Sequence, residues 1–179
     1  MRQLNVLVIC LSLLIMAGCS TYATNRYSIS ADNVVELKKY SDSKAGVAAF
    51  TATTPGQTEI MCRGVGPIKT PDGETFEEFV RSALISEMKL AEAYSDNSEV
   101  TLMGNLNSID FSSTSGEWNL SLTVTSSNGK SITTDVMYDY TTSYFGETAC
   151  NQTAQALMPA VQNLITKVIQ HEEFPKLML

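Results

Sequence analysis

The chain has 179 residues, of which 44% are hydrophobic and 17% charged, and its formal net charge is −7. This length suits a single domain with a sizeable core, and the composition argues against extended disorder. An acidic chain is repelled by nucleic acid and by anionic lipid surfaces. We therefore expect no nucleic-acid partner, and no membrane attachment through a basic patch.

The N-terminus carries a short apolar run. Arg2 supplies a positive charge, residues 6–16 are mostly apolar, and Ala17 and Gly18 are the small residues that precede a signal-peptidase cut. A transmembrane helix needs roughly 20 apolar residues, and polar residues follow this run at once, so an uncleaved anchor is the weaker interpretation. We predict a cleaved signal peptide over residues 1–18.

Cys19 comes directly after the two small residues. The stretch resembles the bacterial lipobox, with Met16 at the position where leucine is usual. This resemblance implies that the sulfur of Cys19 carries acyl chains such as palmitate and that Cys19 becomes the first mature residue. Ser20 resembles the residue found in lipoproteins sorted to the outer membrane. We expect residues 19–29 to form a lipidated tether at the periplasmic face of that membrane, with one domain over 30–179.

The four cysteines leave one pair for the folded domain, because Cys10 lies in the signal and Cys19 takes the lipid. Cys62 and Cys150 are then expected to form a disulfide in the oxidising periplasm. The bridge would close a long loop and stabilise the fold by roughly 4 kcal/mol. Two separate buried thiols are the alternative. A zinc site needs more ligands than the single histidine, His171, provides, so we expect no metal and no cofactor.

The first part of the domain predicts a short helix and two strands. Ser30 precedes an acidic first turn and an apolar run, which is typical of a capped helix. The stretches 45–52 and 59–63 favour a pair of strands joined by a turn. Glycines and a proline at 64–67 are expected to end the second strand.

Two longer helices are predicted from apolar spacing. Thr75 and Glu78 form a capping box, and an apolar stripe continues over residues 75–94. A similar stripe spans 148–170, where Pro159 is expected either to kink the helix or to divide it. Ordered structure is expected to end near Phe174.

Between these helices, residues 100–111, 118–125 and 131–141 alternate with the two-residue period of half-buried strands. They predict an antiparallel meander. Its second hairpin pairs Ser126 with Lys130 around a three-residue loop with Gly129 in the left-handed conformation. In the first strand the apolar residues change from even to odd positions, which either a bulge or a partly covered second face would explain. The fold class is therefore α+β, a two-layer sandwich of a strand pair, a helix, the meander and a second helix.

No nucleotide-binding loop, zinc spacing or nucleophile elbow occurs after the signal. Asp110, Glu117 and Glu147 offer carboxylates, but nothing around them distinguishes a catalytic pair. His171 is best explained as a solvated residue near the end of a helix. We predict that the protein is not an enzyme.

Two loop stretches could form an interaction surface, because the predicted disulfide would bring them together. The first contains Arg63, Val65 and Ile68, and the second contains Tyr144 and Phe145. The alternative is that these residues simply connect the sheet to the helix.

The order of elements, with Cys-Arg at 62–63, Pro-Asp-Gly at 71–73 and Ala-Cys at 149–150, is similar to small proteobacterial lipoproteins of the YajG type. The resemblance brings no catalytic residues. We expect a non-enzymatic accessory or assembly component that binds another envelope protein. One alternative is a small-ligand-binding lipoprotein with a pocket between sheet and helices, lined by residues such as Trp118 and Tyr138. A hydrolase is the third hypothesis.

Overall fold

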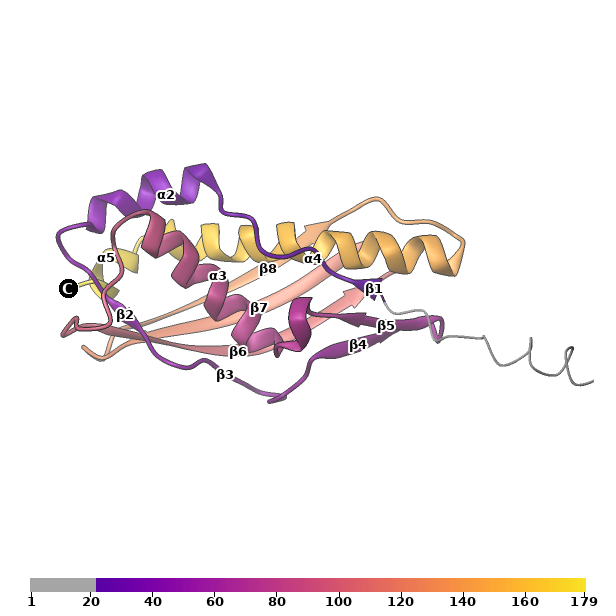
Figure 1. Cartoon of the computed structure of the whole chain (residues 1–179), viewed down its shortest axis with the longest axis horizontal. Coiled ribbons are helices and arrows are strands. Elements are labelled where there is room, and N and C mark those ends of the chain that lie inside the picture. The colour runs from indigo at the N-terminus through magenta and orange to yellow at the C-terminus, as the bar shows by residue number, and fades with distance from the viewer. Residues whose placement is uncertain (1–21) are drawn as a thin grey trace, which may run out of the picture.

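The computed structural model of this chain describes residues 22–179, and Figure 1 shows their arrangement. The predicted signal peptide and Cys19 lie outside the described residues. The strands are β1 (Tyr22–Ala23), β2 (Gly46–Val47), β3 (Thr51–Ala52), β4 (Glu59–Cys62), β5 (Gly66–Lys69), β6 (Thr101–Ser112), β7 (Glu117–Ser126) and β8 (Ser131–Asp139). The α-helices are α2 (Ala31–Leu37), α3 (Phe76–Leu90), α4 (Gly146–Ile169) and α5 (Phe174–Leu177), with 3₁₀ turns at Lys38–Tyr40 and Pro71–Gly73.

The α+β fold class is confirmed, with two sheets and a layer of helices. Strands β6, β7 and β8 form the predicted antiparallel meander, in which Trp118 pairs with Tyr138 and Val124 with Ile132. The amide of Ser126 donates to the carbonyl of Lys130 (2.8 Å), and Gly129 has a φ of 85°. The predicted loop is therefore present. The register of β6 on β7 shifts between Leu106 and Ser108, so of the two explanations the bulge is the one present.

The predicted pairing of 45–52 with 59–63 is wrong. Instead, β2 and β3 each add two residues in parallel along the edge of β6, with Gly46 opposite Thr101 and Thr51 opposite Asn105. The side chain of Arg81 on α3 fixes this segment, because its guanidinium donates to the carbonyls of Ala48 (2.8 Å) and Val47 (3.1 Å). The first segment therefore belongs to the large sheet.

A small second sheet has the strand order β1, β5, β4. The second strand ends at Cys62, before the glycines and proline at 64–67, as predicted. The sequence did not predict that Gly66 and Pro67 begin a further strand, β5, which pairs antiparallel with β4 after a tight turn. Strand β1 pairs in parallel with β5, placing Tyr22 opposite Ile68 and Ala23 opposite Lys69. From residue 22 onward, most of the predicted 19–29 tether is thus part of the domain.

Helix α3 begins at its predicted cap, where the hydroxyl of Thr75 accepts from the amide of Glu78 (3.3 Å). It ends at Leu90, before the predicted residue 94, and Glu92 follows with a positive φ of 61°. Helix α4 is a single helix of 24 residues, so Pro159 does not divide it.

The helices cover one face of the large sheet, as predicted (Figure 1). Helix α4 packs on β7 and β8, α3 packs beside it over β6, and α2 contacts both helices. The core between these layers includes several of the largest fully buried side chains, among them Trp118, Phe76, Phe79, Phe174, Leu84, Met88 and Leu157. Phe174 does not begin a disordered tail, because α5 buries it together with Leu177 and Met178.

A buried carboxylate attaches the N-terminal segment to this core. Glu87 of α3 is fully buried, and one of its oxygens accepts from the hydroxyl of Tyr27 (2.6 Å) and the amide of Ser30 (2.8 Å). The pKa of Tyr27 lies above its ordinary value, mainly because the hydroxyl is buried and also because it donates a hydrogen bond to Glu87. Asn33 joins the same cluster and accepts from Thr166 on α4 (2.8 Å). The polar cluster therefore ties α2 to α3 and α4.

Candidate functional site

The disulfide between Cys62 and Cys150 is formed, with the two Cα atoms 5.9 Å apart. It joins the end of β4 to the second turn of α4, as the sequence predicted. Both cysteines are fully buried. The bridge thereby brings together the turn that follows Cys62 and the loop that precedes α4, and we call this region, residues 63–65 with 144–145, the disulfide corner.

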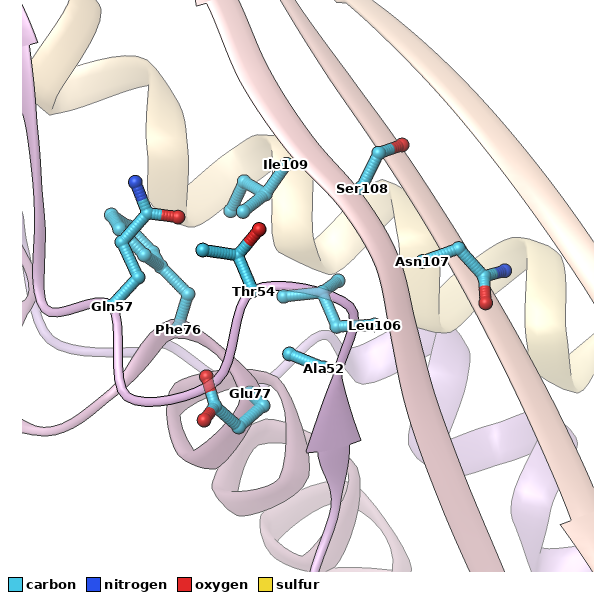
Figure 2. Close-up of a pocket in the computed structure, with 9 residues that line it drawn as sticks. All are labelled: Ala52, Thr54, Gln57, Phe76, Glu77, Leu106, Asn107, Ser108 and Ile109. Atoms are coloured by element: carbon cyan, nitrogen blue, oxygen red, sulfur yellow. The ribbon is translucent and has the colours of Figure 1, made fainter.

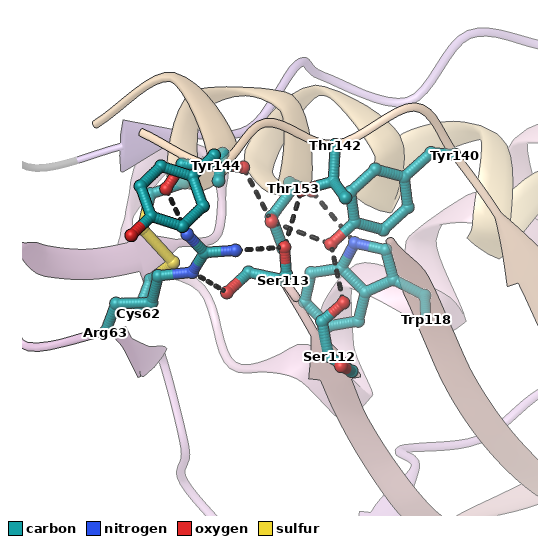
Figure 3. Close-up of a disulfide and its surroundings, with 11 residues drawn as sticks. Cys62, Arg63, Ser112, Ser113, Trp118, Tyr140, Thr142, Tyr144 and Thr153 are labelled. Carbon is teal, nitrogen blue, oxygen red and sulfur yellow. Dashed lines mark hydrogen bonds between the residues drawn. A yellow bond between two sulfur atoms is a disulfide. The ribbon is translucent and has the colours of Figure 1, made fainter. Parts of the chain in front are cut away.

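Arg63 organises the disulfide corner (Figure 3). Its guanidinium donates to the hydroxyl (2.9 Å) and the carbonyl (2.6 Å) of Ser113, and to the carbonyl of Tyr144 (3.1 Å). Arg63 also has a left-handed backbone, with a φ of 48°, and Gly64 follows with a φ of 68°. The side chain thus holds three segments, the β4–β5 turn, the end of β6 and the loop before α4, in one arrangement.

The five residues predicted as an interaction surface do not all reach the surface. Ile68 is fully buried in β5, so its place on that surface is wrong, and Val65 is half-buried. Tyr144 and Phe145, by contrast, are 94% and 74% exposed. Their rings meet edge to face, with centroids 6.1 Å apart. The exposed apolar part of the disulfide corner is therefore an aromatic pair.

Of the two residues expected to line a ligand pocket, Tyr138 does so, in an open hollow between β8 and α4 that Gln152 and Pro159 also line. Trp118, by contrast, is a core residue. It is fully buried, and its indole nitrogen donates to the carbonyl of Thr153 on α4 (2.9 Å). The hydroxyl of Thr153 bonds that of Tyr140 (2.7 Å). Burial raises the pKa of Tyr140 above its usual value. These contacts lock α4 onto β7 (Figure 3).

A small cavity of about 150 Å³ lies between the start of α3, the β3–β4 loop and the bulge of β6 (Figure 2). Ligand pockets usually measure about 300–1,000 Å³. Glu77 on its wall is largely buried, and its carboxylate accepts from the amide of Gly56 (2.9 Å). The side chains of Asn107 and Ser108 point away from Glu77 in this view. The polar groups do not converge, and the cavity is too small for a typical organic ligand.

The outer face of the meander, which faces away from the helices, has a different character. Its side chains are exposed or half-buried, and a ladder of hydrogen bonds links the strands, from Asn107 to Thr123 (2.9 Å) and from Thr123 to Thr133 (2.8 Å). Two large apolar residues, Met103 and Met137, stand on this face at 42% and 62% exposure. The face is therefore a rigid, mostly polar surface on which two methionine side chains are exposed.

Met137 is surrounded by acidic residues. It pairs with Asn119, which in turn pairs with Asp110 on β6. Asp135 and Asp139 lie two positions away on either side, and Glu117 sits directly opposite Asp139. We call these residues the Met137 patch: Asp110, Glu117, Asn119, Asp135, Met137 and Asp139.

None of the four carboxylates of the Met137 patch forms a salt bridge among residues 22–179. Strands β6, β7 and β8 contain no lysine or arginine at all. Like charges that face each other across a strand pair, as Glu117 and Asp139 do, destabilise a sheet. Lys167 of α4 approaches Asp135 and donates to its backbone carbonyl (3.0 Å). No salt bridge within residues 22–179 offsets the repulsion between Glu117 and Asp139, and such a local conflict is typical of a site with a role other than stability.

Sequence reasoning did not single out Met137. The signal was present in the two-residue alternation of residues 131–141, because a strand that buries Ile132, Thr134 and Val136 must point its odd positions outward. In the part of the chain that the structure describes, no cluster of three or more histidine, cysteine or acidic side chains is arranged to hold a metal. No helix within residues 22–179 has the length and apolar character needed to cross a membrane.

No protein-family model matches this chain, and no curated protein shows significant similarity to it. Solved structures that resemble it include the following two. Protein XCC0632 of Xanthomonas campestris, from family DUF330, covers 84% of this chain and 95% of its own length, at 11% identity and a TM-score of 0.49. A candidate lipoprotein of Caulobacter crescentus covers 76% of this chain and 95% of its own, at 13% identity and a TM-score of 0.34. At these values neither similarity assigns a function.

Proposed function

We propose that this chain is a non-enzymatic lipoprotein of the bacterial outer membrane that binds another envelope protein. Acyl chains on Cys19 would hold it at the periplasmic face, and the Met137 patch would contact the partner. The observation that carries the binding role is this patch, where an exposed apolar side chain stands among four unpaired carboxylates on a rigid sheet face.

Two observations support the location. The lipobox-like stretch ends at Cys19, and the remaining two cysteines form a disulfide. Structural disulfides persist in oxidising compartments such as the periplasm and are rare in the cytosol of most organisms. The bridge therefore agrees with export, while the small residues before Cys19 provide the route to lipidation.

The composition of the Met137 patch indicates the chemistry of its partner. An apolar side chain at the centre of a polar rim is the usual layout of a binding hot spot. Methionine adapts its shape to the contacting surface because it is flexible and polarizable. The rim here is acidic, so we expect a partner surface with an apolar contact flanked by lysine or arginine.

Charge reversal offers a test in which loss of binding cannot be attributed to unfolding. Replacing Asp139 by lysine removes the repulsion with Glu117 and places opposite charges across the strand pair. This should raise the free energy of unfolding by up to about 1 kcal/mol. The same change should weaken partner binding, because it opposes the basic partner surface.

The binding readout is a photo-crosslinking residue at position 137 in the full-length protein in intact cells. We expect a discrete adduct with one protein, and its loss when Asp139→Lys is added. The matched control is the same probe at Val35, which is 67% exposed on α2. An adduct that persists with Asp139→Lys, or equal adducts at positions 35 and 137, would contradict a binding role for the patch.

A further inference from the structure

The described chain begins at one end of the molecule, beside the disulfide corner. Tyr22 pairs with Ile68, and the parallel pairing places the N-terminal end of β1 at the Gly66 end of β5. Val65 precedes that end, and its Cγ2 atom lies 3.0 Å from the position that a Cβ on Gly146 would occupy. Figure 1 shows β1, the β4–β5 turn and the start of α4 at the same end, with the C-terminus at the other.

The length of chain before Tyr22 limits how far this end can lie from a lipid anchor. Cys19 precedes Tyr22 by three residues. Even fully extended, three residues span only about 10 Å. Acyl chains attached to Cys19 would therefore keep the disulfide corner close to the bilayer surface.

The disulfide corner presents the side chains that suit such a position. Tyr144 and Phe145 are the two most exposed aromatic residues at this end, at 94% and 74%, and the Arg63 bond to the Tyr144 carbonyl fixes their backbone. Aromatic residues are enriched at the interface between lipid and water, where an apolar ring enters the lipid and a polar tip stays hydrated. Arg63 adds a positive charge that can approach lipid phosphates.

We propose that Tyr144 and Phe145 contact the headgroup region of the outer membrane and set the orientation of the domain on it. This inference rests on the proposed lipidation of Cys19. Phe145 caps α4 in the helix layer, whereas the Met137 patch lies on the outer face of the sheet. The two surfaces belong to different layers, so the seated domain keeps its patch available for a protein partner.

The test uses full-length, lipidated protein in vesicles of phosphatidylethanolamine and phosphatidylglycerol with brominated acyl chains, which quench nearby tryptophan. One variant carries Phe145→Trp. The control carries Leu179→Trp, because Leu179 is 75% exposed at the C-terminal end. The native Trp118 is fully buried and gives the same background in both. We expect quenching and a blue shift of the probe at 145, and neither change at 179.

Flotation of the vesicles separates this inference from the proposed function. Protein that floats with the vesicles while the probe at 145 stays unquenched would overturn the membrane contact alone. Protein that does not float would overturn the lipid anchor and the inference together. A blue shift at 145 in whole envelopes but not in pure vesicles would assign the aromatic pair to a protein partner, and would also overturn the inference.

Discussion

Removal of the disulfide gives the most quantitative prediction for this domain. The double variant Cys62→Ala and Cys150→Ala opens a loop with a sequence separation of 88 residues, which contains α3 and the whole meander. In the chain-entropy model, closing a loop of this size stabilises the fold by about 4.6 kcal/mol. Each kcal/mol shifts Tm by roughly 2–4 °C for a domain of this size. We therefore expect Tm to fall by about 9–18 °C.

Calorimetry and urea unfolding of the full-length protein measure this change. Reduction of the unmodified protein with a thiol should reproduce most of the loss, because it opens the same loop without changing any buried volume. The alternative that the sequence left open, two separate buried thiols, predicts no response to reductant. A Tm that stays within about 2 °C after complete reduction would contradict the loop-closure reasoning.

Three further changes test other parts of the fold. Tyr27→Phe removes a hydrogen bond to the buried Glu87 carboxylate and should cost about 1.5–3 kcal/mol in urea unfolding. Because the folded pKa of Tyr27 lies above the unfolded value of about 10, its contribution is complete below that pH and is lost as pH rises further, so the variant should show a shallower alkaline decline. Gly104→Ala places a Cβ 2.5 Å from the ring of Phe50 and should cost about 1–3 kcal/mol, and Phe50→Leu in the same chain should recover part of it. Trp118→Phe removes the bond to the Thr153 carbonyl and should cost about 1–3 kcal/mol, while an unchanged stability would show that this bond does not hold α4 to the sheet.

The meander could be predicted from the sequence because its strands are long and one face is buried. The alternation of Trp118, Leu120, Leu122 and Val124 fixes a single register against β8, and the turn at Gly129 agrees with it. Helix α3 could be predicted equally well, because a capping box and an apolar stripe mark the same segment.

The sequence indicated strands over 45–52 and 59–63, but neither their pairing nor the strands β1 and β5 could be predicted. Strands β1, β2 and β3 have two residues each, too few to show a two-residue period. Their pairing depends on where β5 and β6 lie in the folded domain, which is tertiary information. Gly66 and Pro67 correctly marked the end of the second strand but hid the start of β5, because proline is tolerated in a strand only at a position where no ladder hydrogen bond is required.

The candidate surfaces were predictable only in part. The number and positions of the cysteines predicted the disulfide, and the disulfide in turn predicted that the two loops of the disulfide corner lie together. Burial then decided which corner residues are accessible, and local sequence does not distinguish the buried Ile68 from the exposed Phe145. The Met137 patch depends on pairing across three strands, because Asp110, Asn119 and Met137 become neighbours only in the folded sheet.

The lipid anchor underlies both the proposed location and the membrane contact, and mass spectrometry of the N-terminal peptide from envelope-purified protein tests it most directly. We predict a mature chain that begins at Cys19 and carries a diacylglyceryl group on the sulfur, with residues 1–18 removed. Changing Cys19 to Ser should release the protein from the membrane or leave it unprocessed. An N-terminal peptide that retains residues before Cys19, or that carries an unmodified Cys19 thiol, would contradict the proposal.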